Sequence, residues 1–244
     1  MNPYGGEPTA VVQAVVGTYS VSAFSTTDDN LTVTDEVVYG EHVFGFEKVF
    51  SRFDLAAARF EQMAYAVRYA LDKWVVNTLL EEGTGAYTTP VGGFTTAGNL
   101  NTIIANLWTK WAGFDITAGA YCVIESGDLT GVLVAMMDQG FSMADAALKN
   151  GFIKHYGGID WYVVRAGTFV DEAATTVSGS KTWTNLNRRL AGIKMTTTYA
   201  SPRDLTYEEK GVSGKTGMEI DVWALVGLRV WNNKAALTVD IALA

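Results

Sequence analysis

The chain has 244 residues, of which 48% are hydrophobic and 12% aromatic, so it can bury a substantial core and does not have a disordered composition. Its net charge of -8 argues against a dedicated nucleic-acid binder, because such a protein carries a basic stripe. Its single cysteine, Cys122, lies in an apolar run. This position predicts a buried, inert thiol, and a lone cysteine forms no intramolecular disulfide.

The first segment, residues 1–18, is almost uncharged and has no pattern that would close a helix or a hairpin. It predicts an extended arm, which would lie either on another subunit or along its own domain as an edge strand. The segment lacks the positive start of a secretory signal, and no apolar run reaches the roughly 20 residues that cross a bilayer. We therefore expect no membrane association, and no glycan on the sequon at Asn30.

Residues 19–50 change to a β pattern. Runs rich in Val, Phe and Thr predict strands, and turn residues occupy 26–30 and 39–41. The pattern indicates at least one hairpin that projects from the fold. No helix precedes it to cover its apolar face, so that face needs another partner.

Residues 51–85 predict one long helix, around which the rest of the chain is organised. Ser51 and Asp54 have the spacing of a capping box, and Gly83 and Gly85 predict a left-handed stop. At 1.5 Å per residue, about thirty residues give a rod of roughly 45 Å.

This helix is apolar on two sides. Residues that recur at steps of three and four predict the side that faces the core: Phe53, Ala57, Phe60, Ala64, Val67, Leu71, Trp74 and Val75. The opposite side is apolar as well, and a neighbouring subunit is the cover that we favour for it. From that side we predict five contact residues: Leu55, Tyr65, Tyr69, Val76 and Leu80.

The remaining chain alternates helix and strand and then returns to β. A Gly- and Thr-rich boundary follows the long helix. We predict helices over 99–112, 127–139 and 142–149, strands over 120–126 and 159–167, a polar loop over 168–180 and a helical turn over 186–190. Towards the end we predict a strand over 193–199, a polar loop over 201–217, and strands over 218–231 and 236–243 that turn at Asn232 and Asn233. β segments at both ends of the chain suggest one shared sheet.

We find no catalytic, cofactor or metal site in the sequence. Residues 208–217 end in Gly-Lys-Thr like a phosphate-binding loop, but Glu209 stands where the first glycine is required and a strand follows instead of a helix. The only histidines, His42 and His155, lie far apart and have no ligand-type residues at the right spacing. Carboxylates such as Asp72, Glu208 and Glu209 leave a small α/β enzyme open as a remote alternative.

The order of these segments resembles the major capsid proteins of tailed bacteriophages. Short phrases agree in order: LTVTDE before the long helix, ALD within it, GTG after it, then AALKNGFI, GGIDWYVV and VWALVGLRVWNNKAALTVDI. The resemblance implies an α+β fold of the Hong Kong 97-like type. Its parts would be an N-terminal arm (1–18), an extended loop or hairpin (19–50), a peripheral domain with a spine helix (51–95 and 195–244) and an axial domain (96–194).

The resemblance also implies a function. The chain would be a non-enzymatic major capsid protein that assembles, through hexamers and pentamers of itself, into an icosahedral phage head around double-stranded DNA that it does not read by sequence. Scaffolding and portal proteins, and possibly a decoration protein, would be its partners. It would lie in the virion and assemble in the host cytoplasm. The alternative in the same fold is an encapsulin-like compartment that holds a cargo enzyme.

Overall fold

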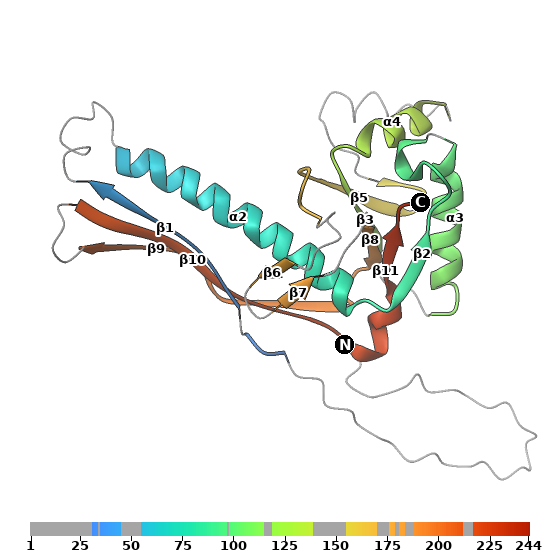
Figure 1. Ribbon diagram of the computed structural model, residues 1–244. Coiled ribbons are helices and arrows are strands. Elements are labelled where there is room, and N and C mark those ends of the chain that lie inside the picture. The colour runs from blue at the N-terminus through green and yellow to red at the C-terminus, as the bar shows by residue number, and fades with distance from the viewer. Residues whose placement is uncertain are drawn as a thin grey trace, which may run out of the picture.

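Two sheets and one long helix organise the molecule (Figure 1). The computed structural model describes residues 31–33, 35–44, 55–96, 98–114, 119–138, 155–169, 176–178, 181–183, 188–211 and 217–244. The helices are α2 (Leu55–Glu82), α3 (Asn99–Trp111) and α4 (Leu129–Asp138), with the 3-10 helices η1 (Gly93–Thr95) and η2 (Asn232–Leu237). The strands are β1 (Asp35–Phe44), β2 (Gly85–Thr88), β3 (Ala120–Glu125), β4 (His155–Tyr156), β5 (Ile159–Val164), β6 (Thr176–Ser178), β7 (Lys181–Trp183), β8 (Arg188–Ile193), β9 (Thr197–Gly211), β10 (Gly217–Val230) and β11 (Thr238–Ala242).

A six-stranded sheet forms the body of the molecule, in the order β2-β11-β8-β3-β5-β4. Its central strand β3 is apolar at every position but its last, because both faces of the sheet are covered. Cys122 and Ile124 pack with α3 and α4 on one face, whereas Val123 packs with the C-terminal half of α2 on the other. We call this sheet, with α3 and α4, the body.

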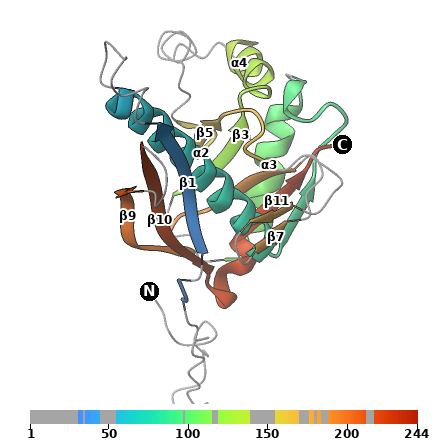
Figure 2. The ribbon, with the colours of Figure 1, turned by 60° about the vertical axis from the view of Figure 1, so that its left-hand side comes forward.

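A three-stranded antiparallel sheet, in the order β1-β10-β9, extends away from the body with α2 along one of its faces (Figures 1 and 2). Alternate residues of β10 point to the helix, and Ile220 and Val222 pack there against Met63 and Val67. At 1.5 Å per residue the 28 residues of α2 span about 42 Å. We call β1, β9, β10 and the N-terminal half of α2 the projection.

The projection joins the body through one apolar cluster that draws on α2 and on both sheets. Trp74 and Leu79 of α2 pack there with Val123 and Leu190 of the six-stranded sheet and with Val226 of β10. The C-terminal half of α2 therefore lies between the two sheets, which bury most of its apolar side chains, while Asp72 and Glu81 remain exposed.

The predicted long helix is present and ends directly before Gly83, as predicted, but the left-handed conformation predicted for its stop is wrong. It runs from Leu55 to Glu82, and the capping box at 51–54 lies outside the described residues. Neither Gly83 nor Gly85 has a positive φ. Gly85 opens β2 beside β11, where a Cβ would meet the carbonyl oxygens of Ala236 and Thr238 at 2.8 and 2.9 Å, so close strand packing explains this glycine.

The predicted N-terminal hairpin is wrong in its described part. The expected turn at 39–41 lies inside β1, which pairs without a break with β10 from the other end of the chain. A Cβ at Gly40 would lie 2.5 Å from an Asp221 carboxylate oxygen on β10, a contact that rotation of the Asp221 side chain would relieve. The prediction of a sheet built from both ends of the chain is confirmed by the same pairing. The arm at 1–18 and the first predicted strand lie outside the described residues.

In the second half of the chain, the predictions made from apolar periodicity are confirmed, whereas several loop predictions are wrong. α3, α4, β3 and β5 are confirmed, and the helix expected at 142–149 lies outside the described residues. The expected helical turn at 186–190 is instead the start of β8, and the expected loop at 168–180 includes β6, which pairs with β7. Most of the loop expected at 201–217 is strand β9. β10 and β11 do not pair with each other but enter different sheets.

Candidate inter-subunit surface

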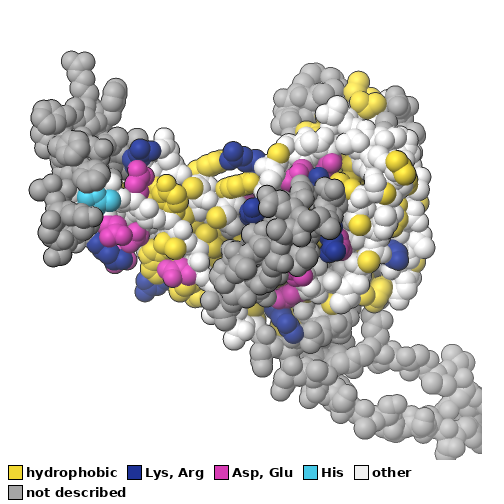
Figure 3. All heavy atoms as spheres, viewed as in Figure 1, with side chains coloured by type: hydrophobic (Ala, Val, Ile, Leu, Met, Phe, Trp, Pro, Cys, Tyr) yellow, Lys and Arg dark blue, Asp and Glu magenta, His cyan; other side chains and the backbone are white. Residues whose placement is uncertain are grey.

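Several large exposed apolar side chains lie on the projection, as Figure 3 shows in yellow, and others, such as Val91 and Met195, lie outside it. On the projection they come from β1, from α2 and from β9, and include Val38, Tyr39, Phe60, Tyr65 and Tyr207. Tyr65 is 60% exposed and Val38 is 58% exposed. β1 and β9 are the outer strands of their sheet, so each presents an edge with no partner strand among the described residues. Exposed apolar groups along an edge are typical of a surface that another chain covers.

The face of the projection sheet that points away from α2 carries the exposed Val38, which pairs with Trp223, but it also carries several charges. The Lys210 ammonium lies 3.2 Å from a Glu208 carboxylate oxygen and 3.1 Å from an Asp221 carboxylate oxygen. The Arg203 guanidinium lies over the Trp223 ring, 5.5 Å from the ring centroid. The charges, and the Trp223 ring covered by Arg203, are compatible with contact to solvent on this face. We therefore centre the candidate surface on α2 and on the strand edges.

The predicted contact residues divide into three groups. Tyr65 projects into solvent, and the side chain of Leu55 lies outside the described residues. Tyr69 is half-buried, since its hydroxyl donates to the Ala166 carbonyl at 3.3 Å and the Arg165 guanidinium lies 5.0 Å from its ring centroid. These contacts are within the chain, and the role of Tyr65 and Tyr69 in a subunit contact stays a prediction.

Val76 and Leu80 require a correction. They are 7% and 4% exposed and belong to the apolar cluster that joins the projection to the body. The reason is that the C-terminal half of α2 lies between two sheets, so its second apolar side is covered by this chain. No surface is left there for a neighbouring subunit.

For two residues of the candidate surface, Phe60 and Tyr207, the sequence predicted a different position. Phe60 was expected in the core but is 36% exposed, and its ring meets the Tyr207 ring edge-on with centroids 5.0 Å apart. Tyr207 lies in the stretch predicted as a polar loop. The alternation of Leu205 and Tyr207 with polar neighbours is the strand signal that identifies this residue.

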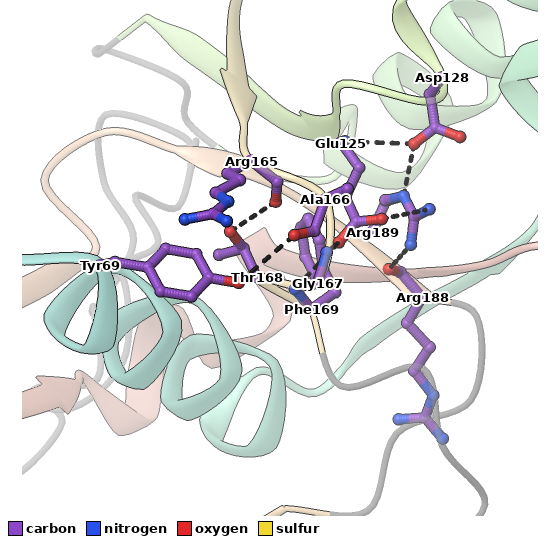
Figure 4. A network of polar contacts seen from close by, with 10 residues as sticks. All are labelled: Tyr69, Glu125, Asp128, Arg165, Ala166, Gly167, Thr168, Phe169, Arg188 and Arg189. Carbon is purple, nitrogen blue, oxygen red and sulfur yellow. Dashed lines mark hydrogen bonds and ion pairs between the residues drawn. The ribbon is translucent and has the colours of Figure 1, made fainter. Parts of the chain in front are cut away.

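A buried charged network lies where β3, β8 and the segment 165–169 meet (Figure 4). Nε of Arg189 donates to an Asp128 carboxylate oxygen at 2.5 Å, and Nη2 lies 3.4 Å from a Glu125 carboxylate oxygen. The side chains are 6 to 8% exposed. Because Arg189 and backbone N–H groups occupy the carboxylate oxygens, this arrangement is that of a structural ion pair rather than of an acid–base pair.

The residues considered for an enzyme do not form a site in the described part of the chain. Glu208 pairs with Lys210, and Glu209 accepts a hydrogen bond from the Tyr207 hydroxyl. Burial raises the pKa of Asp72. Among the described residues, no group of three or more His, Cys, Asp or Glu side chains could hold a metal ion. None of the described helices has the length and apolar character needed to cross a membrane.

An exposed cluster on the body gives a pH-dependent prediction. The Lys194 ammonium donates to Asp160, whose other oxygen lies 2.9 Å from Nδ1 of His155. The hydrogen bond from Lys194, followed by that from His155, holds the pKa of Asp160 below its ordinary value. A folded pKa below the unfolded value of about 3.9 stabilises the protein above that pH, and this stabilisation is lost as the pH falls through the folded pKa.

Asp160→Asn should therefore lower the melting temperature slightly at neutral pH, as is typical when an exposed ion pair is removed. The difference from the wild type should disappear in acid, where Asp160 is protonated in both states. The measurement is thermal unfolding of both proteins at about pH 2 to 7, a range that includes the unfolded pKa of about 3.9. A difference that stays constant throughout that range would contradict the assignment.

Comparison with known proteins gives matches at the level of structure. No family model matches the chain, and no curated protein matches it. The capsid structure of the cyanophage P-SCSP1u is similar, with a TM-score of 0.72 and 14% identity, over 99% of this chain and 81% of that chain. A structure of Mycobacterium phage Che8 has a TM-score of 0.69 and 18% identity, over 92% of this chain and 76% of that chain. A virus-like particle from Pyrococcus furiosus has a TM-score of 0.59 and 9% identity, over 91% of this chain and 82% of that chain. The chain thus has the α+β fold found in phage capsid structures.

Proposed function

We propose that this protein is the repeating subunit of a closed shell, the major capsid protein of a tailed bacteriophage head. The observation that carries the proposal is the similarity to the cyanophage capsid structure, which extends over 99% of the chain. A match of this extent includes the projection as well as the body. The role is structural and needs no catalytic site, so the satisfied carboxylates of the buried network are compatible with it.

The finer description uses the Hong Kong 97-like arrangement. We propose that α2 is the spine helix, that residues 51–95 and 195–244 form the peripheral domain, and that 96–194 form the axial domain. The arm would be residues 1–18 and the extended loop 19–50. β11 pairs with β2 inside the peripheral ranges and with β8 of the axial range, so the sheet of the body crosses that domain boundary.

The exposed apolar side chains of the projection support assembly. They leave apolar surface in water in a single copy, and a contact with a second copy would bury it. We propose that hexamers and pentamers of this chain form through such contacts. Tyr65, which has no cover among the described residues, would lie within one of them.

We propose double-stranded DNA as the content of the shell, held without sequence recognition. The net charge of -8 supports this, because a strongly basic lining would bind the packaged phosphates tightly and oppose their release. Scaffolding and portal proteins would take part in assembly in the host cytoplasm, a decoration protein could bind outside, and the product would be the virion.

The second candidate is a cellular compartment that holds a cargo protein. The observation that favours it is the similarity to the virus-like particle from Pyrococcus furiosus, over 91% of this chain. Its TM-score of 0.59 is lower than the 0.72 of the cyanophage capsid, so we rank it second.

One preparation can test both candidates. The full chain, expressed alone and with candidate scaffolding and packaging proteins, is analysed by sedimentation velocity and negative-stain electron microscopy, and its particles are then treated with nuclease. We expect closed particles of uniform size, which protect DNA when the packaging partners are present. A single co-purifying enzyme in place of DNA would support the compartment, and a monomer under every condition would contradict both shell functions.

A further inference from the structure

The segment 165–169 forms a bridge between α2 and the body (Figure 4). On the side of α2, the Tyr69 hydroxyl donates to the Ala166 carbonyl at 3.3 Å, and Nδ2 of Asn77 donates to the Thr168 carbonyl at 2.9 Å. On the side of the body, one carboxylate oxygen of Glu125 accepts from the Gly167 N–H at 2.9 Å and from the Phe169 N–H at 3.2 Å. The bridge therefore holds α2 at two points, two helical turns apart.

The same two peptide units make all four of these contacts. The Ala166 carbonyl and the Gly167 N–H belong to one planar peptide, and the Thr168 carbonyl and the Phe169 N–H belong to another. In a trans peptide these groups point in opposite directions, and no cis peptide is present in the described residues. Each peptide thus acts as a rigid strut, with the Glu125 carboxylate at one end and a side chain of α2 at the other.

The Glu125 carboxylate is itself fixed in place. Its second oxygen lies 3.4 Å from Nη2 of Arg189, whose Nε donates to Asp128, while the backbone N–H of Glu125 also donates to Asp128, at 3.2 Å. The Arg189 guanidinium also lies 5.1 Å from the centroid of the Phe169 ring. Hydrogen bonds to a charged acceptor in a buried site are directional and stronger than those between neutral groups.

Directional contacts matter here because most of the join is apolar, with a further hydrogen bond from the Val230 N–H to the Glu82 carboxylate, at 2.8 Å, at the end of α2. The cluster around Trp74 and Leu79 gives cohesion between α2 and both sheets, but burial of apolar surface is non-directional. Apolar burial therefore holds α2 against the body without fixing the angle between the helix and the body. The two peptide struts fix that angle.

We propose that Glu125 is a positioning residue that sets the angle at which α2, and with it the projection, leaves the body. It acts through the peptides 166–167 and 168–169, without contacting α2 itself. Its consequence for assembly rests on the proposed shell function: the angle would determine where the projection presents its exposed apolar side chains to the next copy. The angle itself can be measured without any assembly.

The test is a distance measurement by pulsed dipolar spectroscopy in the full chain. Spin labels are attached after Glu61→Cys on the projection and Lys110→Cys on the body, both at exposed positions. The native Cys122 is fully buried and does not react in the folded protein. An excess of unlabelled chain removes distances between copies. We expect one narrow distance distribution for the otherwise native sequence.

Two variants act on the struts from opposite ends, one by weakening their contacts with the body and the other by removing their donors on α2. Glu125→Gln keeps the size of the side chain but removes its charge, and Tyr69→Phe combined with Asn77→Ala removes the donors on α2. Both should broaden or shift the distance distribution in a chain that stays folded. In Glu125→Gln the amide protons of Gly167 and Phe169 should also exchange about tenfold faster, as expected for the loss of a hydrogen bond to a charged group.

The control is Ile103→Val, a buried substitution in α3 that destabilises the body without touching the bridge. It should leave the distance distribution unchanged, which separates positioning from a general loss of stability. If Glu125→Gln does not fold, the double variant on α2 decides alone. A folded variant of either kind with the native distance distribution would overturn the proposal, whether or not the protein forms a shell.

Discussion

Replacing Tyr65 by Asp should leave the chain folded and abolish particle formation. Tyr65 is 60% exposed in the single chain, so the substitution should change the free energy of unfolding by no more than about 0.5 kcal/mol. In the assembled shell the same position would bury an unpaired carboxylate, which costs several kcal/mol at each copy of the contact. Sedimentation velocity and negative-stain images of the purified variant measure the effect.

Tyr65→Phe is the matched control, because it keeps the ring and removes only the hydroxyl. It should assemble like the wild type. We use Tyr65 alone rather than together with Tyr69, because Tyr69 bonds to Ala166 within the chain and its loss would also affect the bridge. Normal particles from Tyr65→Asp would show that this side of α2 lies outside the subunit contacts.

Replacing Trp74 by Ala should destabilise the fold more than any other change on α2, by about 3 to 5 kcal/mol. Trp74 is 1% exposed and packs where α2 meets both sheets, so its removal leaves a cavity at the join between projection and body. Urea unfolding followed by tryptophan fluorescence and by circular dichroism measures the loss.

Tyr65→Ala is the matched control for this prediction, because it removes an aromatic ring from the exposed side of the same helix. It should change stability by less than about 0.5 kcal/mol. A loss for Trp74→Ala that is no larger than the loss for Tyr65→Ala would mean that the join is not a tightly packed core.

The parts of the fold that the sequence predicted well are those with one strong period. In α3 the residues Leu100, Ile103, Leu107 and Trp111 recur on one side, and all are buried against the body. β3 is short and apolar at almost every position because both of its faces are covered. In such segments the local pattern and the tertiary environment agree.

β9 was predicted as a loop because its sequence is polar, and the neighbouring strand that makes it a strand is distant in the sequence. Its residues 203–210 are mostly charged or polar, which usually indicates a loop. They form a strand because β10 provides the hydrogen-bond ladder and because one face and one edge of β9 remain in solvent. The pairing of β1 with β10 joins residues nearly two hundred positions apart, which no local pattern indicates.

The candidate surface was predicted only in part for a related reason. The sequence identifies a helix that is apolar on two sides, but it does not say whether the second side is covered by this chain or by another. In the C-terminal half, at Val76 and Leu80, this chain covers it, and in the N-terminal half Tyr65 remains exposed. The bridge to Glu125 was not predicted, because it depends on backbone groups at 166–169 and on Arg189, 64 residues away from Glu125.

The most direct test of the account is a cryo-electron microscopy reconstruction of the particles formed by the full chain. The central claim is that the apolar side chains exposed on the projection of one copy become buried against a neighbouring copy. We expect a closed shell in which Tyr65 lies in a contact between two subunits. A shell in which Tyr65 stays open to solvent in every subunit, or a protein that remains a monomer, would contradict the account.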